Sequence, residues 1–288
     1  MKLNVSLYIP VYNGESTIES VLKSVLKLNP GPDEIIVVND GSSDNTNKIL
    51  NNYKNRINII NNSDNKGLAH SRNIGISKSK NENVASLDAD VEVDESWLKD
   101  LLDIKKKYQS SICGATLIEK YKNKNIYNLW RHVHATQNNY GNKDIDNLGS
   151  PLAGSNTLLS KSAWERVGGY DVQYKTNGED ATFCQKLIKN KFKISYSAEA
   201  KAYHLRNDNL KTLVNSVRRA YIYGAGLKKP TIMRFIQRTI RHFKYFIMNS
   251  IKDIKILKFS LIYINLMIFL NLAIKEFIGL IKNKPDYV

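Results

Sequence analysis

Two aspartates one residue apart, Asp88 and Asp90, are the side chains in this sequence whose type and spacing most directly suggest chemistry. They follow an apolar run that begins at Val84 and is typical of a buried strand, so both carboxylates would emerge at one edge of a sheet. Two convergent carboxylates suit a divalent cation, and such a cation often holds a diphosphate. The pair therefore predicts metal chemistry on a phosphorylated substrate.

Other structures also use closely spaced acidic residues, which after a strand often cap a helix or lie solvated in a turn. An EF-hand loop starting at Asp88 would need glycine at its sixth position and glutamate at its twelfth, where the chain has Val93 and Lys99. A phosphatase of the haloacid-dehalogenase type would have glycine and threonine after the pair, where the chain has Val91 and Glu92. The secondary structure around the pair must therefore decide between a metal site, a helix cap and a solvated turn.

Strand-like and helix-like segments alternate along the first half of the chain. The sequence predicts strands at 5–10, 34–38, 57–60, 83–87 and, further on, 192–196. It also predicts a helix that begins with a capping box from Ser16 to Glu19, and another helix over residues 67–78. This alternation, with near-continuous apolar strands, indicates an α/β fold with a mostly parallel sheet and helices on both faces. Ligands of such sheets bind at the carboxyl ends of the strands, so the polar loops 10–15, 39–44 and 88–90 should line one crevice.

Composition limits the class of protein. With 288 residues, 42% of them hydrophobic, the chain can bury a full core and predicts one large domain plus an appendage. The cysteines Cys113 and Cys184 form no C-x-x-C pattern, which indicates buried thiols in a reducing compartment. The apolar N-terminal run breaks at Pro10 without a cleavage site, so it is interpreted as a strand and the catalytic part is expected in the cytoplasm. Neither a G-x-G-x-x-G motif after the first strand nor a P-loop motif is present in the sequence.

The basic charge is concentrated at the C-terminal end. Residues 201–288 contain 17 Lys/Arg and 4 Asp/Glu, which is +13 of the formal net charge of +16. Residues 231–250 predict a basic amphipathic helix, which suits an anionic membrane surface. Its basic side holds Arg234, Arg238, Arg241 and Lys244, and its apolar side holds Ile232, Phe235, Ile236, Ile240, Phe243, Phe246 and Ile247. The alternative is a helix packed on the catalytic domain with its basic side in solvent.

A second apolar segment, residues 259–274, carries no formal charge. As a helix it would be about 24 Å long, against about 30 Å for the hydrocarbon core of a bilayer. We therefore expect a peripheral attachment at the inner face of the membrane, with a single transmembrane segment at 259–274 as the alternative. A nucleic-acid partner is not expected, because the basic residues alternate with an apolar face and not with stacking aromatics.

Five motifs occur in order along the chain. They are Ile9-Pro-Val-Tyr-Asn-Gly-Glu15, Val37-Val-Asn-Asp-Gly-Ser-Ser-Asp-Asn-Thr46, Asn65-Lys-Gly-Leu-Ala-His-Ser-Arg-Asn73, Leu87-Asp-Ala-Asp90 and Gly178-Glu-Asp180. In this order and spacing they resemble the signature of family 2 glycosyltransferases with the GT-A fold. The resemblance implies a catalytic domain over residues 1–205, and it leaves residues 206–288 as a helical, membrane-associating extension.

The resemblance also implies a nucleotide-sugar site, whose expected residues are Pro10, Tyr12, Glu15, Asp40, Lys66, Gly67, Arg72, Asp88 and Asn156. The first four would hold the base, because an aromatic ring can stack on it and a carboxylate can accept a base N–H. Lys66, Gly67 and Arg72 would face the nucleotide or its phosphates, and a structural salt bridge is the alternative for Arg72. Asn156 is the candidate for contact with the sugar.

In the same way, the resemblance implies a divalent cation, Mn²⁺ or Mg²⁺, held by Asp90, Asp88 and His204. Within the Glu179–Asp180 pair, Asp180 would be the base that deprotonates the acceptor hydroxyl. Acidic residues in the first turn of a helix also complement the helix dipole, which is the structural alternative for this pair.

The implied activity is an inverting transfer from a nucleoside diphosphate sugar to a lipid-linked or glycan acceptor. The alternatives are a metal-dependent phosphatase or nucleotidyltransferase, and a non-catalytic binding subunit with the same fold.

Overall fold

The computed structural model describes residues 2–135, 140–224 and 230–283. The chain divides into two compact units, of which unit 1 comprises Met1–Lys120 and Thr136–Leu205, and unit 2 comprises Tyr121–Ala135 and Arg206–Val288. The predicted extension begins at the same place, residue 206, but it did not include residues 121–135, which the structure groups with that extension.

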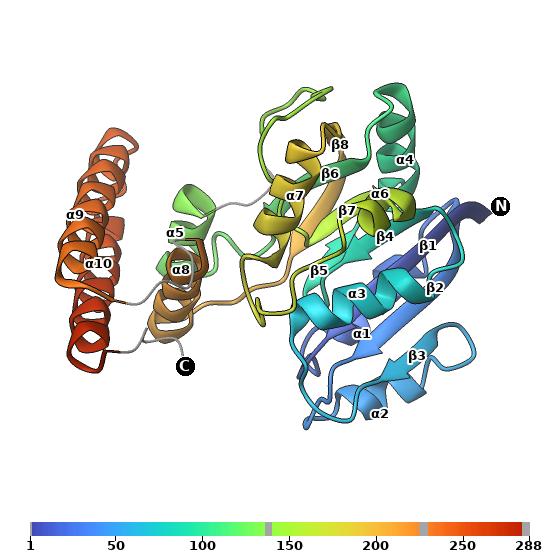
Figure 1. Ribbon diagram of the computed structural model, residues 1–288, viewed down its shortest axis with the longest axis horizontal. Helices are drawn as coiled ribbons and strands as arrows, with labels where there is room; N and C mark the ends of the chain where they lie inside the picture. Colours follow the sequence, from blue (N-terminus) through green and yellow to red (C-terminus); the bar gives the residue numbers. More distant parts are fainter. Residues whose placement is uncertain (1, 136–139, 225–229, 284–288) are drawn as a thin grey trace. The chain divides into compact units, whose positions relative to one another are not determined.

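Unit 1 is built on an eight-stranded mixed sheet with the strand order β3-β2-β1-β4-β7-β6-β8-β5 (Figure 1). The strands are β1 (Lys2–Val11), β2 (Gly31–Asn39), β3 (Asn58–Asn61), β4 (Asn83–Leu87), β5 (Val91–Val93), β6 (Ile112–Glu119), β7 (Asn156–Ser160) and β8 (Ile194–His204). Strands β3, β2, β1 and β4 run parallel, as predicted. Strand β7 is antiparallel to β4 and β6, β6 is parallel to β8, and β5 is antiparallel to β8. The loops after β1, β2 and β4 therefore lie at the same sheet edge.

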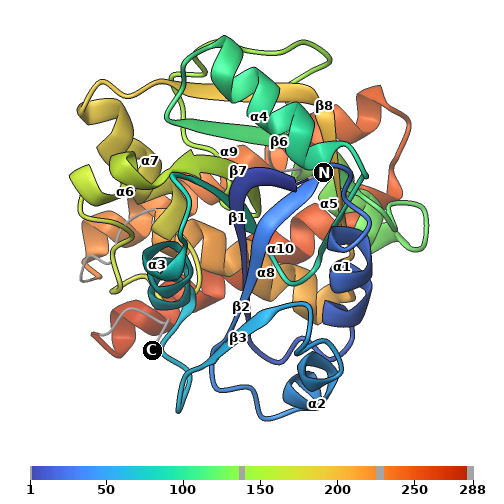
Figure 2. The same cartoon turned by 90° about the vertical axis from the view of Figure 1, so that its right-hand side faces the viewer.

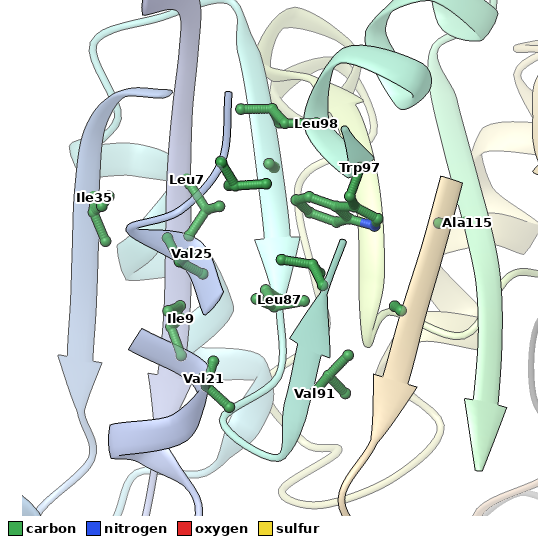
Figure 3. Close-up of a cluster of buried hydrophobic side chains, with 14 of the residues drawn as sticks. Leu7, Ile9, Val21, Val25, Ile35, Leu87, Val91, Trp97, Leu98 and Ala115 are labelled. Atoms are coloured by element: carbon green, nitrogen blue, oxygen red, sulfur yellow. The ribbon is translucent and has the colours of Figure 1, made fainter. Parts of the chain in front are cut away.

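Helices cover both faces of this sheet. Those of unit 1 are α1 (Ile18–Val25), α2 (Thr46–Asn51), α3 (Leu68–Lys78), α4 (Trp97–Lys107), α6 (Lys161–Arg166) and α7 (Glu179–Lys189). Figure 2 shows α3, α6 and α7 on one side of the strands and α1 and α2 on the other. Side chains of β1 point alternately to the two faces of the sheet, so Leu7 and Ile9 enter one core and Tyr8 enters the other. Burial on both faces explains the continuous apolar run from Leu7 to Val11. In Figure 3, Leu7 and Ile9 pack with Val21 of α1 and Trp97 of α4.

Two local predictions differ from the structure. The capping box from Ser16 to Glu19 is not formed, because Thr17 is the N-cap residue of α1 and its hydroxyl donates to the carbonyl oxygen of Ala89 at 2.7 Å. The strand predicted at 192–196 begins at Ile194 and continues to His204, so His204 is the last residue of a strand. This longer strand places His204 beside the loop that carries Asp90.

Unit 2 is helical and consists of α5 (Ile126–His134), α8 (Leu210–Gly224), α9 (Ile232–Lys255) and α10 (Ser260–Ile281). Its apolar core is formed by residues of α5, α8 and α10. The ion pair between Arg238 of α9 and Glu276 of α10, at 3.2 Å, and the 2.6 Å hydrogen bond from Asn265 to Asp253 show that α9 and α10 are antiparallel. Helix α10 extends past the predicted segment 259–274, and its 22 residues make it long and apolar enough to cross a membrane.

Candidate active site

The loops after β1, β2 and β4 are hydrogen-bonded to one another. The Glu15 carboxylate accepts from the backbone and side-chain nitrogens of Asn45, at 3.0 and 2.9 Å. The Thr17 hydroxyl reaches the loop between Asp88 and Asp90 through the carbonyl oxygen of Ala89. Tyr12, directly after β1, is 50% exposed. The three polar loops therefore meet, and Tyr12 presents an accessible ring beside them.

Asp40, at the end of β2, holds the N-terminus of α3. Its Oδ2 atom accepts from the Gly67 nitrogen at 2.8 Å, and its Oδ1 atom accepts from the Lys66 nitrogen at 3.1 Å and from the Asn62 side chain at 2.6 Å. Gly67 has φ 98°, and a Cβ atom there would lie 2.9 Å from Cα of Lys175. Only glycine fits this close approach without strain. Asp40, Lys66 and Gly67 are thus brought together, and their contact with a nucleotide stays a prediction.

Arg72 is buried, and its guanidinium is bonded to groups of the protein. Nη2 lies 2.7 Å from Oδ1 of Asp88, and Nε lies 3.3 Å from Oε1 of Glu179. Nη1 donates to the Ser86 hydroxyl at 2.8 Å and to the Gly154 carbonyl oxygen at 3.1 Å. The geometry thus matches the salt-bridge alternative for Arg72, and direct contact with a nucleotide stays a prediction. Its role in the structure is to join three segments: the loop after β4, the residues before β7 and the start of α7.

Helix α7 begins after Gly178, which adopts a left-handed conformation with φ 92°. Glu179 is 2% exposed, and burial, followed by the neighbouring Asp180 carboxylate, raises its pKa from 4.5 to about 7. Asp180 is partly exposed, and its Oδ2 atom accepts from the Gly154 nitrogen at 3.1 Å. The two neighbouring carboxylates therefore differ in position, because Glu179 points inward to Arg72 and Asp180 is the more accessible.

Asn156 opens β7 and is fully buried. It pairs with Leu87, the residue before Asp88, and its Oδ1 atom accepts from the Ala115 nitrogen at 3.1 Å. Its Nδ2 atom is buried and has no hydrogen-bond partner among the residues that the structure describes. The predicted contact with a sugar stays a prediction, and this buried amide is the group that could donate to one.

Asp90 and His204 form the second half of the site. Oδ2 of Asp90 lies 3.3 Å from Nε2 of His204, and Nδ1 of His204 lies 3.0 Å from Oε1 of Glu119. A carboxylate oxygen and an imidazole nitrogen at this spacing fit a divalent cation such as Mn²⁺. Over residues 2–135, 140–224 and 230–283, however, no group of three such side chains is arranged to hold a metal alone. The remaining ligands would then come from Asp88, a diphosphate or water.

Sequence reasoning missed Ser86 and Glu119 as members of the site. Gly154, two residues before the predicted Asn156, contributes to the site through its backbone. The sequence could have indicated Glu119 as a site residue, because it is an acidic residue at the end of an apolar strand, as Asp88 is directly after one. The structure brings together the predicted Arg72, Asp88, Glu179 and Asp180 in one group and the predicted Asp90 and His204 in an adjacent one.

Solved structures share this fold. The crystal structure of residues 1–349 of TarS from S. aureus in complex with UDP has a TM-score of 0.59 at 19% identity, over 75% of this chain and 64% of that one. The mannosyltransferase PcManGT from Pyrobaculum calidifontis, in complex with GDP-Man and Mn²⁺, has a TM-score of 0.59 at 15% identity, over 76% and 62%. These likenesses show the fold, which is of the GT-A type.

A sequence model of the family described as Glycosyl transferase family 2 matches residues 6–168, more than half of the chain. The chain belongs to this family. It is 29% identical over 227 residues to the O-antigen chain rhamnosyltransferase RfbN of Salmonella typhimurium, covering 71% of this chain and 67% of that protein. It is also 29% identical over 212 residues to the poly-beta-1,6-N-acetyl-D-glucosamine synthase of Staphylococcus epidermidis, covering 70% of this chain but only 50% of that protein. Its homologues thus act in O-antigen and polysaccharide synthesis. The segment that the family model matches ends at residue 168, so Asp180 and His204 lie beyond it.

Proposed function

We propose that this chain transfers a sugar, with inversion at the anomeric carbon, from a nucleoside diphosphate sugar to an acceptor hydroxyl in the synthesis of a surface polysaccharide or glycolipid. The observation that carries this proposal is the bridge made by Arg72, which joins Asp88 at 2.7 Å and Glu179 at 3.3 Å. The bridge ties the side of the site that would hold a diphosphate to the helix start that carries Asp180. Donor and acceptor chemistry would therefore meet in one hydrogen-bonded network.

The donor would lie along the joined loops after β1, β2 and β4. The exposed ring of Tyr12 would stack on the base, and the loops around Asp40 and Gly67 would border the ribose and phosphates. Asp90 and Nε2 of His204 would hold Mn²⁺ or Mg²⁺, with Asp88 beside them. When bound, the cation offsets the negative charge that develops on the leaving diphosphate.

Asp180 would take the proton of the acceptor hydroxyl while the oxygen attacks the anomeric carbon from the face opposite the diphosphate. Its Oδ2 atom is held by the Gly154 N–H at 3.1 Å, which fixes the orientation of the carboxylate. Glu179 suits this role less, because it is buried and bonded to Arg72. One carboxylate acting as base needs no covalent sugar intermediate, so the transfer inverts.

Asp180→Asn tests this assignment. General-base catalysis typically contributes about 10²- to 10⁴-fold, so turnover should fall by that factor while the affinity for the donor stays the same. The matched control is Asp146→Asn, because Asp146 is exposed and pairs with Lys193 away from these residues. Unchanged turnover in Asp180→Asn would refute the base assignment. Release of free phosphate or pyrophosphate would instead favour the phosphatase or nucleotidyltransferase alternative, and donor binding without product would favour a binding subunit.

A membrane partner is proposed from the surface of unit 2. Helix α9 exposes an apolar stripe at helical spacing: Ile232, Ile236, Ile240, Phe243, Ile247, Ile251 and Ile254. Helix α10 and the residue before it expose a second stripe: Phe259, Tyr263, Leu266, Leu270, Ile274, Phe277 and Ile281. Ring contacts join the two helices: the ring centroids of Phe243 and Phe269 are 5.6 Å apart, and those of Phe235 and Phe277 are 6.1 Å apart.

Basic residues on α9, including Arg241, Lys244 and Lys255, border this apolar surface, so an anionic lipid surface complements it. We propose attachment to the inner face of the membrane, where a lipid-linked or glycan acceptor would be reached, and a span by α10 is the alternative. Ile240→Asp should weaken cosedimentation with vesicles that contain anionic lipid. Gln237→Asp, which adds the same charge outside the stripe, should weaken it less. Equal losses in both variants would refute insertion of the stripe.

A further inference from the structure

The two ring nitrogens of His204 have different surroundings. Nδ1 lies 3.0 Å from Oε1 of Glu119, whose side chain is 5% exposed, and Nε2 lies 3.3 Å from Oδ2 of Asp90, whose side chain is 31% exposed. The imidazole itself is 6% exposed. A cation or a diphosphate can therefore approach the Nε2 side of the ring, whereas the Nδ1 side is enclosed.

The Glu119 carboxylate pairs with Nδ1 of His204. An ionised carboxylate only accepts hydrogen bonds, so in the Glu119 pair Nδ1 of His204 must carry the proton. The lone pair of the neutral ring is then on Nε2, the nitrogen that faces Asp90. Metal-binding histidines commonly donate their other ring N–H to a carboxylate in this way, which fixes both the tautomer and the ring orientation.

The fold creates this pair through a register shift. Strands β6 and β8 are parallel and pair Ala115 with Ser197, but the next pair is Thr116 with Lys201, so three residues of β8 bulge out. Without this bulge the register would place Lys201 opposite Glu119, and with it His204 takes that place. The bulge is held by hydrogen bonds, including the Thr116 hydroxyl to the Ala198 carbonyl oxygen at 3.1 Å. A strand irregularity next to the site therefore selects which side chain meets Glu119.

We infer that Glu119 is a positioning residue for the metal site: it holds His204 with Nδ1 protonated, so that Nε2 is presented to the divalent cation together with Asp90. This inference rests on the proposed function, since it assigns a partner to a ligand of the proposed cation. The motifs in the sequence do not include Glu119, and its contribution acts entirely through His204.

The test measures the affinity of the purified full-length protein for Mn²⁺ alone, from the loss of the free-ion EPR signal. Glu119→Ala should weaken binding by about 10- to 100-fold, the usual effect of removing such a partner. Glu119→Gln keeps an oxygen that can accept from Nδ1 and should bind Mn²⁺ more tightly than Glu119→Ala. Glu92→Ala is the matched control, because Glu92 lies on the neighbouring strand β5 and pairs with Lys120, and it should leave the affinity unchanged.

A double-mutant cycle separates positioning from general damage. If Glu119 acts through His204, Glu119→Ala should have no further effect on Mn²⁺ affinity in a His204→Ala background. Additive losses of Mn²⁺ affinity in the double variant would overturn the role of Glu119 but not the metal site. The same holds if Glu119→Ala binds Mn²⁺ as tightly as the wild type while His204→Ala binds it more weakly. Unchanged affinity in His204→Ala would overturn the metal site of the proposed function as well. Glu119→Gln keeps the test valid should the alanine variant fail to fold.

Discussion

Replacing Glu179 with glutamine should remove the part of the pH dependence of the unfolding free energy that comes from this carboxyl group. Burial raises the pKa of this carboxyl from 4.5 to about 7, with Asp180 as the next cause. Between these values the folded protein keeps a proton that the unfolded chain has lost. The contribution to stability is therefore fully present below pH 4.5 and is lost as the pH rises through 7. At about 1.4 kcal/mol for each pH unit, the loss amounts to about 3 kcal/mol.

The assay is urea denaturation at constant ionic strength over a series of pH values. Glu179→Gln should match the wild type at acid pH, where both side chains are neutral, and should exceed it by up to about 3 kcal/mol above pH 7. Glu165→Gln is the control for an exposed glutamate on α6 and should follow the wild-type curve. Parallel curves for Glu179→Gln and wild type would refute the reasoning, because they would mean that the ion pair with Arg72 outweighs burial.

Two further predictions concern the residues that assemble the site. Arg72→Met should lower the unfolding free energy by about 3–5 kcal/mol above pH 7, where Glu179 is ionised, because it leaves this buried carboxylate unpaired. Glu179→Gln in the same chain should restore part of this loss in thermal denaturation at that pH, and no loss in Arg72→Met would contradict the bridge. Gly67→Ala should cost about 1–3 kcal/mol, because it places a side chain at φ 98° against the backbone of the opposing loop. An alanine variant as stable as the wild type in the same assay would contradict that close approach.

The sequence could predict the parallel part of the sheet, because buried parallel strands are continuous apolar runs and end in recognisable polar loops. It could not predict that β8 reaches His204 through a bulge, since that register depends on pairing with β6, a strand about 80 residues away. The same limit applies to Arg72, whose partner Glu179 is 107 residues further along the chain. Local pattern identified the residue types, and long-range pairing decided which of them meet.

In unit 2 the sequence predicted both terminal helices but underestimated the second. The charges of Lys275 and Glu276 ended the predicted apolar segment, whereas the helix continues to Ile281, because Lys and Glu are good helix formers and Glu276 is paired with Arg238 of α9. Residues 121–135 were not expected to belong there, and they are held by contacts such as Trp130 with Asn265 at 2.6 Å. That contact joins residues 135 positions apart, which no local pattern can indicate.

The most direct test of the central claim is to follow one transfer to its products, with a panel of nucleoside diphosphate sugars, Mn²⁺ and lipid-linked or glycan acceptors. We expect one nucleoside diphosphate to be released for each sugar transferred, and NMR of the product to show the anomeric configuration opposite to that of the donor. Release of free phosphate or pyrophosphate, or a product with the configuration of the donor, would contradict the account.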